Sequence, residues 1–462
     1  MNAFEIQCAK SIAHLSMLRG KRSLSVENPL VKTRMSDKDY RLKFTDEESL
    51  THTLAFISSI SDVPGYVTAV CIKETRNLSL DVLLAINKGQ PDDGEAVLNR
   101  VKYGFEDLFS TLCNASTEST NNEDRVYDAI LTMCYDRILR RLKLRGPKRG
   151  KLNIKEMLMR GRESIRETEK SLELFPLITE AKKVEGLVDG WLAEPTRSNL
   201  KVLIEGLDGL KRLKDPCNKV EDIPDTTQFP LDMRGNLINI IDKVTYYWKC
   251  AVFLCQLWGK YLLYGQVKVV LVCLPPNAFD GAPAKHRKAN LASKILRRKP
   301  ESKDAKGLKS MCRLKIPESA NAISDASQEL AEKAEETLKE GKVHAEIQLL
   351  FHCYELDKME SPPRVVCSNK DACYLCNAFI SMHGKLYTPK SHGRLYHLWR
   401  LPRTENIELH WRFVKHLEGL IRKNVLLPKK GKRRFSCESS LGALQSPSRL
   451  CSSSNEMKKI LE

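Results

Sequence analysis

Long runs of β-branched residues are scarce in this sequence, whereas Leu, Lys, Glu and Arg are abundant. Because these four residues are common in helices and β-branched residues favour strands, we expect far more helix than strand. A chain of 462 residues is long for one hydrophobic core, so two domains, or one domain with a large insertion, are expected. The 42% hydrophobic and 29% charged content is typical of a folded protein and argues against a disordered one.

The segment 1–15 lacks an apolar stretch of signal-peptide length, which argues against secretion. The 15 Cys residues are therefore expected to be thiols with a metal-binding or catalytic subset, and not a disulfide framework. The apolar stretch 246–264 contains Lys249, Lys260 and two Trp residues, which favours a buried or amphipathic helix over a membrane span. We expect an intracellular protein, cytoplasmic or nuclear, without a membrane partner.

Acidic residues are fewer than basic ones, 58 against 76, so the net charge is +18. This excess raises affinity for nucleic acid through counterion release, and a solvated basic surface is the alternative interpretation. The basic run 429–434 matches a nuclear-localisation or nucleic-acid-binding patch, although such short runs also arise by chance. Nucleic acid is therefore one expected partner, and the sequence identifies no protein partner.

The last third of the chain alternates between helical and strand-like patterns. We expect, in order, helices at 326–339 and 343–356, a strand at 363–367, a helix at 371–383, a strand at 394–401 and a helix at 407–423. Asp371 is suited to be the N-cap of the helix at 371–383, and Gly384 is suited to end it.

Two short motifs mark the starts of two of these helices: His344-Ala345-Glu346, and Cys373 with Cys376. A catalytic zinc uses three nitrogen or sulfur ligands and a water, and two cysteines three residues apart at a helix start can face one metal. Together the motifs match the H-x-E … C-x-x-C signature of zinc nucleobase deaminases. They predict His344, Cys373 and Cys376 as Zn²⁺ ligands and Glu346 as the proton carrier. The alternative is two buried thiols and a surface histidine.

A family resemblance rests on two segments within 342–402, VHAEIQLLFHCYEL and PRVVCSNKDACYLCNAFISMHGKLYTPKSHGRLYHLWRLP. They resemble the OTT-type branch of the nucleic-acid and nucleotide deaminase-like superfamily, which is abundant in fungal genomes. The resemblance implies a cytidine-deaminase-like α/β/α core, zinc, and deamination of a base that it does not specify. The common deaminase pattern has Pro before the first Cys, and here the residue is Ala372. This departure concerns substrate preference and leaves the ligands unchanged.

The implied fold needs a helix and a β-hairpin ahead of the His-Ala-Glu helix, yet no hairpin lies directly upstream of residue 342. A predicted helix at 46–59 and strands at 66–72 and 78–86 supply one, and VTAV and LLAIN resemble the start of a deaminase core. The intervening region has helical patterns at 124–144, 153–174, 177–193, 197–213 and 236–264, and one strand-like run at 267–273.

The predicted fold class is therefore α/β, with an α/β/α cytidine-deaminase-like core that is interrupted by, or joined to, a large and mostly α-helical region. Five segments follow: an N-terminal extension (1–44), the first part of the deaminase core (45–89), a helical insertion or second domain (90–320), a deaminase-like domain with the zinc site (321–427) and a basic, Ser-rich disordered tail (428–462).

Four further residues are candidates for substrate binding. Asn87 ends the second predicted strand, where deaminases often place a substrate-contacting Asn, and it suits a turn equally well. Ser368 and Lys370 precede the Cys helix and are candidates to line the pocket, with a plain connecting loop as the alternative. Arg394 is a candidate to contact a phosphate or base, and a surface turn is the other interpretation.

Three hypotheses about function remain open on the sequence. The first is hydrolytic deamination of a cytosine- or adenine-type base, free or in nucleic acid. The second is a non-enzymatic helical interaction protein that retains a structural zinc site, which His352 or Cys367 as a fourth ligand would favour. The third is a metal-free interaction or nucleic-acid-binding protein, which cysteines pointing away from His344 would favour. Glu346 favours the enzyme, because a structural zinc site needs no carboxylate beside an open position.

Overall fold

The computed structural model describes residues 3–19, 25–29, 37–75, 79–114, 121–146, 150, 152–168, 172–213, 219–261, 266–280, 320–356 and 361–426. These residues form two compact units. Among them, unit 1 contains those of 1–56, 64–102 and 264–426, and unit 2 contains those of 57–63 and 103–263. The two tail-end predictions, the disordered segment 428–462 and the basic run 429–434, lie outside the described residues.

Unit 1 is built on a mixed four-stranded sheet with the strand order β4-β3-β2-β5. Strands β2 (Thr68–Glu74) and β3 (Ser79–Ile86) form an antiparallel hairpin. Strand β5 (Val366–Ser368) pairs antiparallel with β2, and β4 (Gln266–Leu271) pairs in parallel with β3. Consecutive side chains of the two central strands are buried, so both faces of the sheet are covered.

The sheet unites strands that are far apart in the sequence. The hairpin predicted at 66–86 is confirmed, and β5, which pairs with it, overlaps the strand predicted at 363–367 but begins and ends later. Strand β4 was expected within the helical region 90–320, yet it pairs with β3 inside unit 1. The apolar run predicted as a strand at 267–273 is therefore part of the sheet of unit 1, where β3 provides its backbone hydrogen bonds.

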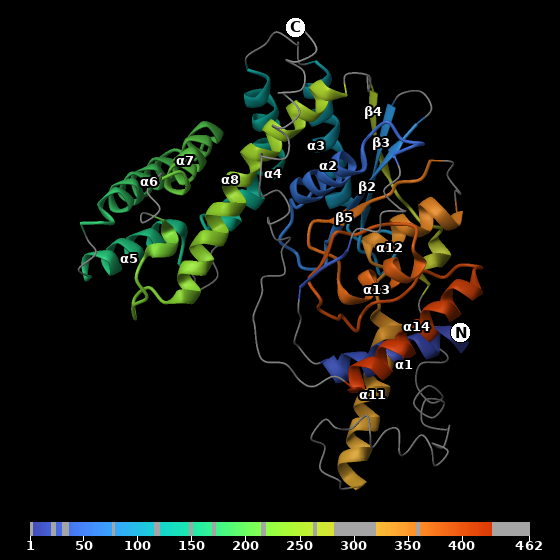
Figure 1. Cartoon of the computed structure of the whole chain (residues 1–462). Helices are drawn as coiled ribbons and strands as arrows, with labels where there is room; N and C mark the ends of the chain where they lie inside the picture. Colours follow the sequence, from blue (N-terminus) through green and yellow to red (C-terminus); the bar gives the residue numbers. More distant parts are fainter. Residues whose placement is uncertain are drawn as a thin grey trace. The chain divides into compact units, whose positions relative to one another are not determined.

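Among the described residues, six helices belong to unit 1, with only the last residue of α2, Ile57, assigned to unit 2. They are α1 (Ala3–Arg19), α2 (Phe44–Ile57), α11 (Ala320–Glu340), α12 (Ala345–Leu350), α13 (Tyr374–His383) and α14 (Ile407–Leu426). A π-helical segment, Phe351–Leu356, continues α12. Helix α12 packs on β2, β3 and β5, while α13 packs against α12 and α14 (Figure 1). The mixture of sheet and helices agrees with the predicted α/β class.

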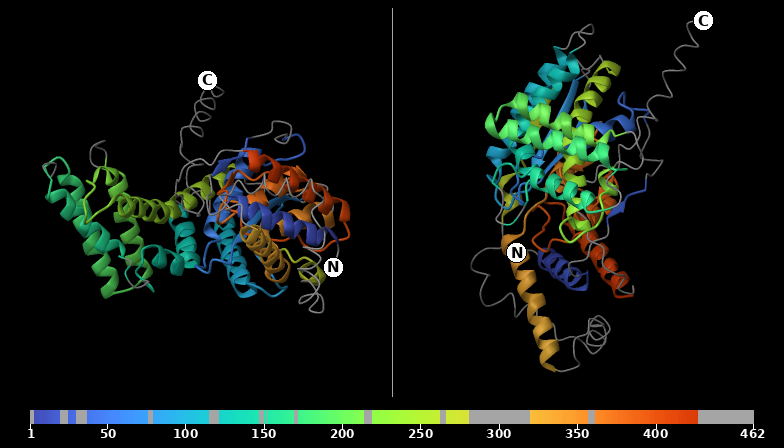
Figure 2. Two further views of the ribbon diagram at one scale, coloured as in Figure 1. Left: turned by 90° about the horizontal axis from the view of Figure 1, so that it is seen from below. Right: turned by 90° about the vertical axis from the view of Figure 1, so that its left-hand side faces the viewer.

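Helix α1 was not predicted, because 1–44 shows only weak periodicity. It packs against both α14 and α11 (Figures 1 and 2). Cys8 and Ile12 belong to the main core, whereas Ala9 and Ala13 pack in a second small cluster with α11. A helix that is buried on two sides has no single apolar face, so its sequence lacks the amphipathic pattern that identifies most helices. The expected N-terminal extension is thus part of unit 1.

The strand predicted at 394–401 is wrong. In the described range 361–426, this segment takes part only in an isolated bridge, between Trp399 and Lys342. Two backbone hydrogen bonds hold it there, from Lys342 N–H to the Leu398 carbonyl and from Arg400 N–H to the Lys342 carbonyl. No longer ladder forms among the described residues, because the backbone of the partner turns into α12 two residues later.

Unit 2 is helical. Helix α3 (Glu95–Cys113) leads into it, and its other helices are α4 (Asn122–Arg141), α5 (Ile154–Arg166), α6 (Phe175–Ala193), α7 (Arg197–Lys211) and α8 (Leu231–Lys260). Five of these match the helices predicted between 124 and 264, with shifted ends. Helix α5 ends earlier than predicted and begins with a capping box between Asn153 and Glu156.

Three short elements complete the bounds: the strand pair β1 (Val26–Glu27) with β6 (Lys390–Ser391), and the 3₁₀ turns Val220–Asp222 and Pro276–Phe279. No helix in the described ranges is both long enough and apolar enough to cross a membrane.

Candidate metal centre

His344 is the residue that precedes the first turn of α12, where it acts as the N-cap. The approach to this helix is held against the end of β3 by two reciprocal backbone hydrogen bonds between Val343 and Lys88, of 2.8 and 3.0 Å. Asn87 then accepts a hydrogen bond of 2.8 Å from the Ala345 N–H through its side-chain oxygen. This contact satisfies an N–H group that the helix itself leaves without a partner, and it fixes the backbone beside His344.

Cys373 is the N-cap of α13, and the prediction of Asp371 as N-cap is wrong. Its Sγ accepts a hydrogen bond of 3.3 Å from the backbone N–H of Cys376, as a Ser or Asp oxygen does at other helix starts. Because Cys373 is the N-cap, its sulfur, and not the Asp371 carboxylate, lies near the backbone N–H groups in the first turn that have no partner within the helix. Gly384 ends the helix as predicted, with φ 82°, a left-handed conformation that glycine adopts without strain.

The imidazole of His344 and the two thiols meet at one point. The Nδ1 atom of His344 lies 3.4 Å from Cys376 Sγ and 3.6 Å from Cys373 Sγ. The three donor atoms all lie within 4.8 Å of one another, and all three residues are buried. Trp399 donates a hydrogen bond of 3.3 Å from its indole N–H to Cys376 Sγ. One nitrogen and two sulfur donors at this spacing form a cluster that can hold a metal ion.

Glu346 is buried beside this cluster and is not one of its three members. Its Oε2 atom lies 3.6 Å from Cys376 Sγ. Its Oε1 atom accepts a hydrogen bond of 2.9 Å from Ser368 Oγ, at the end of β5. The carboxylate is thereby held next to the donor cluster by a strand on one side and by its own helix on the other.

The electrostatics of the cluster favour a thiolate. Burial raises the pKa of the Cys373 thiol, but hydrogen bonding with Cys376 and the charge of His344 outweigh it and lower this pKa well below its usual value. Thiolate is the form in which cysteine binds metals. Burial raises the pKa of Glu346 above its usual value, although the charge of His344 opposes the rise. A carboxyl with a raised pKa is suited to exchange a proton near neutral pH.

The four further candidates divide into two pairs. Asn87 and Ser368 lie next to the metal-binding cluster: Asn87 contacts the backbone of Ala345, and Ser368 contacts the carboxylate of Glu346. Lys370 instead donates from Nζ to the carbonyl of Pro64 at 3.2 Å, and the Arg394 side chain is exposed. Arg394 contributes through its backbone, whose carbonyl accepts the N–H of Tyr374 in the first turn of α13.

Two aromatic residues near the centre were missed by the sequence analysis. Trp399 is fully buried against Cys376, and Tyr396 is 40% exposed with its ring centroid 6.2 Å from that of His344. Both lie in the segment that was predicted as a strand. The aromatic content of RLYHLW was the available signal, but only the fold places these rings beside the metal-binding residues.

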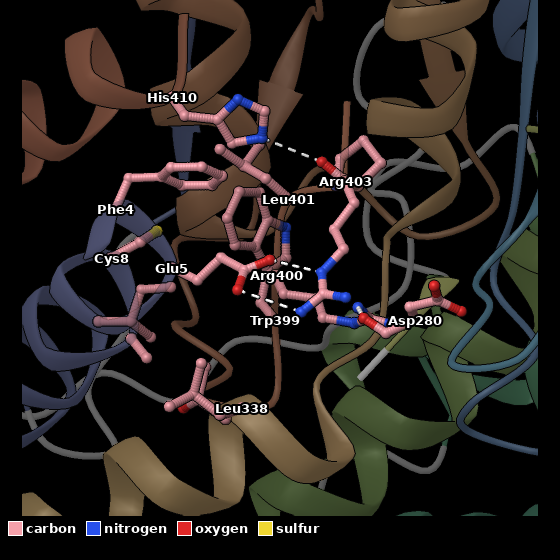
Figure 3. Close-up of a pocket in the computed structure, with 14 residues that line it drawn as sticks. Phe4, Glu5, Cys8, Asp280, Leu338, Trp399, Arg400, Leu401, Arg403 and His410 are labelled. Carbon is pink, nitrogen blue, oxygen red and sulfur yellow. Dashed lines mark hydrogen bonds and ion pairs between the residues drawn. The ribbon is translucent and has the colours of Figure 1, made fainter. Parts of the chain in front are cut away.

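A small cavity lies between Trp399 and α1 (Figure 3). Its volume is about 40 Å³, and Phe4 and Cys8 line it together with Trp399. A water needs roughly 10–15 Å³ by this measure, so the space suits a few waters and no larger ligand. At its edge Arg403 forms an ion pair of 2.6 Å with Glu5. The cavity therefore belongs to the packing of α1.

Comparison with known proteins agrees with the geometry. Residues 343–403 match the family described as OTT_1508-like deaminase. This range contains His344, Glu346, both cysteines of the cluster and Trp399. Searches among curated proteins and among solved structures found no match. The resemblance to the OTT-type deaminase-like family is thus confirmed for this part of the chain.

Proposed function

We propose, from the deaminase-family match over 343–403, that this protein is a zinc-dependent hydrolytic deaminase of a nucleobase. One observation carries the proposal: the buried carboxylate of Glu346 lies beside a cluster of nitrogen and sulfur donors, the types that zinc prefers, and is not itself one of the three donors.

The spacing of the donors supports zinc. Tetrahedral zinc with Zn–S of about 2.3 Å and Zn–N of about 2.0 Å places a sulfur and a nitrogen ligand about 3.5 Å apart. The two distances from His344 Nδ1 to the sulfurs, 3.4 and 3.6 Å, agree with this value. His344 Nδ1 therefore already lies at the separation from each sulfur that a shared zinc ion would require.

The number of donors supports a catalytic site over a structural one. A structural zinc is closed by four protein ligands, whereas a catalytic zinc keeps one position open. Among the described residues the cluster has three members, and neither His352 nor Cys367 belongs to it. Both cysteines face His344, which also argues against the metal-free interpretation.

Each residue around the ion would have a separate role in deamination. When bound, zinc supplies Lewis-acid activation of a water molecule. Glu346 Oε2 would carry two protons in turn: the first from the attacking water to a ring nitrogen, and the second from the hydroxyl that has added to the base to the amino group, which leaves as ammonia. Ser368 would hold the other carboxylate oxygen, so that Oε2 keeps one orientation. The exposed ring of Tyr396 offers a face on which a planar base can stack.

The substrate class in this proposal is a cytosine- or adenine-type base, free or within nucleic acid. The family match supports a deaminase, and the H-x-E … C-x-x-C motif favours a base as its substrate. The net charge of +18 supports attraction of a phosphate-bearing substrate. Single-stranded nucleic acid is accordingly included among the substrates to be tested.

The test compares Glu346→Gln with the wild-type protein. Zinc per chain is measured first, and then ammonia release from bases, nucleosides, nucleotides and single-stranded oligonucleotides. We expect the variant to keep its zinc and to lose activity by a factor of about 10² to 10⁴, because the carboxylate moves a proton and binds no metal. The control is Glu340→Gln, which changes an exposed carboxylate of the same unit. Full activity in Glu346→Gln, or a wild-type protein without zinc, would contradict the proposal.

A further inference from the structure

His392 has no role in the deaminase chemistry described above, although it lies beside the start of α13. Its backbone N–H donates a hydrogen bond of 3.1 Å to the carbonyl of Ala372, the residue directly before Cys373. The hydroxyl of Ser391 donates to the same carbonyl at 2.9 Å. Two hydrogen bonds therefore fix this part of the chain to the N-terminus of α13, and the side chain of His392 begins next to the metal-binding cluster.

The turn after His392 determines which of its ring nitrogens carries the proton. Gly393 has φ 69°, a left-handed conformation that glycine adopts without strain, and the chain turns back toward the histidine ring. The backbone N–H of Arg394 then donates a hydrogen bond of 3.0 Å to Nδ1 of His392. A ring nitrogen that accepts a hydrogen bond carries no proton, so the ring is neutral and Nε2 is its N–H donor.

This Nε2 donor is held in place but has no partner in the part of the chain that the structure describes. His392 is only 6% exposed, so the position of its ring is fixed by packing. The Nε2 atom is nevertheless not fully enclosed, in contrast to the ring nitrogens of His52. A fixed donor that still meets open space is suited to pair with an atom of a bound molecule.

The neighbouring aromatic rings place His392 at the candidate metal centre. The rings of His392 and Tyr396 lie edge to face, with centroids 5.7 Å apart. The ring of Tyr396 lies in turn 6.2 Å from that of His344. A base that stacks on the exposed part of Tyr396 is therefore close both to a metal-binding residue and to His392.

The chemistry of this donor distinguishes the two types of base in the proposed function. Cytosine has a ring carbonyl next to the ring nitrogen that would receive the first proton from Glu346, and the oxygen of this carbonyl accepts hydrogen bonds. Adenine has no carbonyl oxygen. A site that is built to donate a hydrogen bond discriminates against a ligand without the acceptor, because the donor is then left unpaired.

We propose that Nε2 of His392 donates a hydrogen bond to the carbonyl oxygen of a cytosine-type base and so makes the site selective for cytosine over adenine. This assignment rests on the proposed function, because it requires a base that is held beside His344. His392 is then a specificity-determining residue, which binds the base and takes no part in proton transfer.

The test measures the binding of three ligands that lack the amino group and cannot be deaminated. Pyrimidin-2-one keeps the carbonyl of cytosine, pyrimidine-2-thione has sulfur, a weak acceptor, in its place, and purine represents adenine. Each base is presented as a nucleoside and as the central residue of a single-stranded oligonucleotide. Calorimetric titration of the zinc-loaded full-length protein measures each Kd.

The wild-type protein should bind pyrimidin-2-one at least about tenfold more tightly than the other two bases. His392→Asn keeps the turn, because the Asn side-chain oxygen can accept the Arg394 N–H, but it has no donor at the position of Nε2. The variant should bind pyrimidin-2-one about tenfold more weakly, with unchanged zinc content, melting temperature and purine binding. The matched control is His416→Asn, at a half-buried histidine of α14, which should keep the wild-type affinities.

Each outcome supports or overturns the assignment. Selectivity for pyrimidin-2-one that His392→Asn removes supports it. Equal or tighter binding of purine by the wild type, no binding of any ligand, selectivity that His392→Asn leaves unchanged, or loss of zinc in this variant overturns it. In these cases zinc in the wild type and ammonia release would still uphold the proposed function. A wild-type protein without zinc contradicts the proposed function, and the assignment with it.

Discussion

Ser368 is a small residue whose position decides how Glu346 points. Its hydroxyl contacts Glu346 Oε1 at 2.9 Å and also the backbone carbonyl of Lys370. A hydroxyl has one proton, so it donates to only one of the two at a time. In the proposed deaminase, Ser368 is therefore a positioning residue that acts through the carboxylate of Glu346.

The first prediction follows at this scale. Ser368→Ala should lower kcat about tenfold, or about 1.4 kcal/mol, with little change in KM or in zinc content, because the carboxylate loses one orienting contact. Steady-state kinetics and metal analysis measure both quantities. Ser49→Ala, which alters a hydroxyl bound to a helix carbonyl in α2, is the control. Loss of zinc together with activity would instead assign Ser368 a role in the fold.

At the scale of an element, α2 holds a histidine in an unusual state. Neither ring nitrogen of His52 has a hydrogen-bond partner within the described residues. Burial, and then the charge of Lys390, lower its pKa from 6.5 to about 4. The unfolded chain therefore binds more protons than the folded one between these pH values, and the free energy of unfolding falls as pH falls through this window.

The second prediction is the pH dependence that His52 causes. A shift of this size corresponds to at most about 3 kcal/mol, reached below pH 4. His52→Leu should remove most of the stability loss between pH 7.5 and pH 4.5, about 2 kcal/mol, as measured by chemical denaturation at both values. Thr51→Val, a buried change in the same helix that removes no titratable group, should keep the wild-type pH dependence. Equal pH dependence in His52→Leu and the wild type would show that other groups cause it.

At the scale of the whole molecule, the two compact units should unfold separately. The cluster of His344, Cys373 and Cys376 joins the starts of α12 and α13, both in unit 1. A metal bound there stabilises only the folded form of that unit, by about 4 kcal/mol at a free concentration 1,000 times its Kd.

The third prediction is therefore that a chelator lowers the midpoint temperature of one of two calorimetric transitions, the one that belongs to unit 1. His344→Ala should reproduce this loss without chelator. Leu203→Ala, a fully buried change in α7, should lower only the other transition and so identify unit 2. A chelator that moves both transitions equally, or neither, would be incompatible with a metal held in unit 1.

The sequence by itself determined the local parts of this protein. Glu346 follows His344 by two residues, and Cys376 follows Cys373 by three, so each motif and its chemistry can be identified without knowledge of the fold. The hairpin β2–β3 and the amphipathic helices of unit 2 were predicted for the same reason, since their patterns repeat within a few residues. The order of the motifs also predicted the family that the match over 343–403 supports.

Only the tertiary structure decided the contacts between distant segments. It brings Asn87 to the start of α12, directs the Trp399 indole to Cys376 and pairs β4 with β3. It also buries α1 on two sides, so the sequence of this helix lacks the amphipathic pattern from which a helix is predicted. The physical reason is common to all four: hydrogen-bond satisfaction and close packing depend on which segments meet in space, whereas a sequence pattern records only which side of its own element each residue occupies.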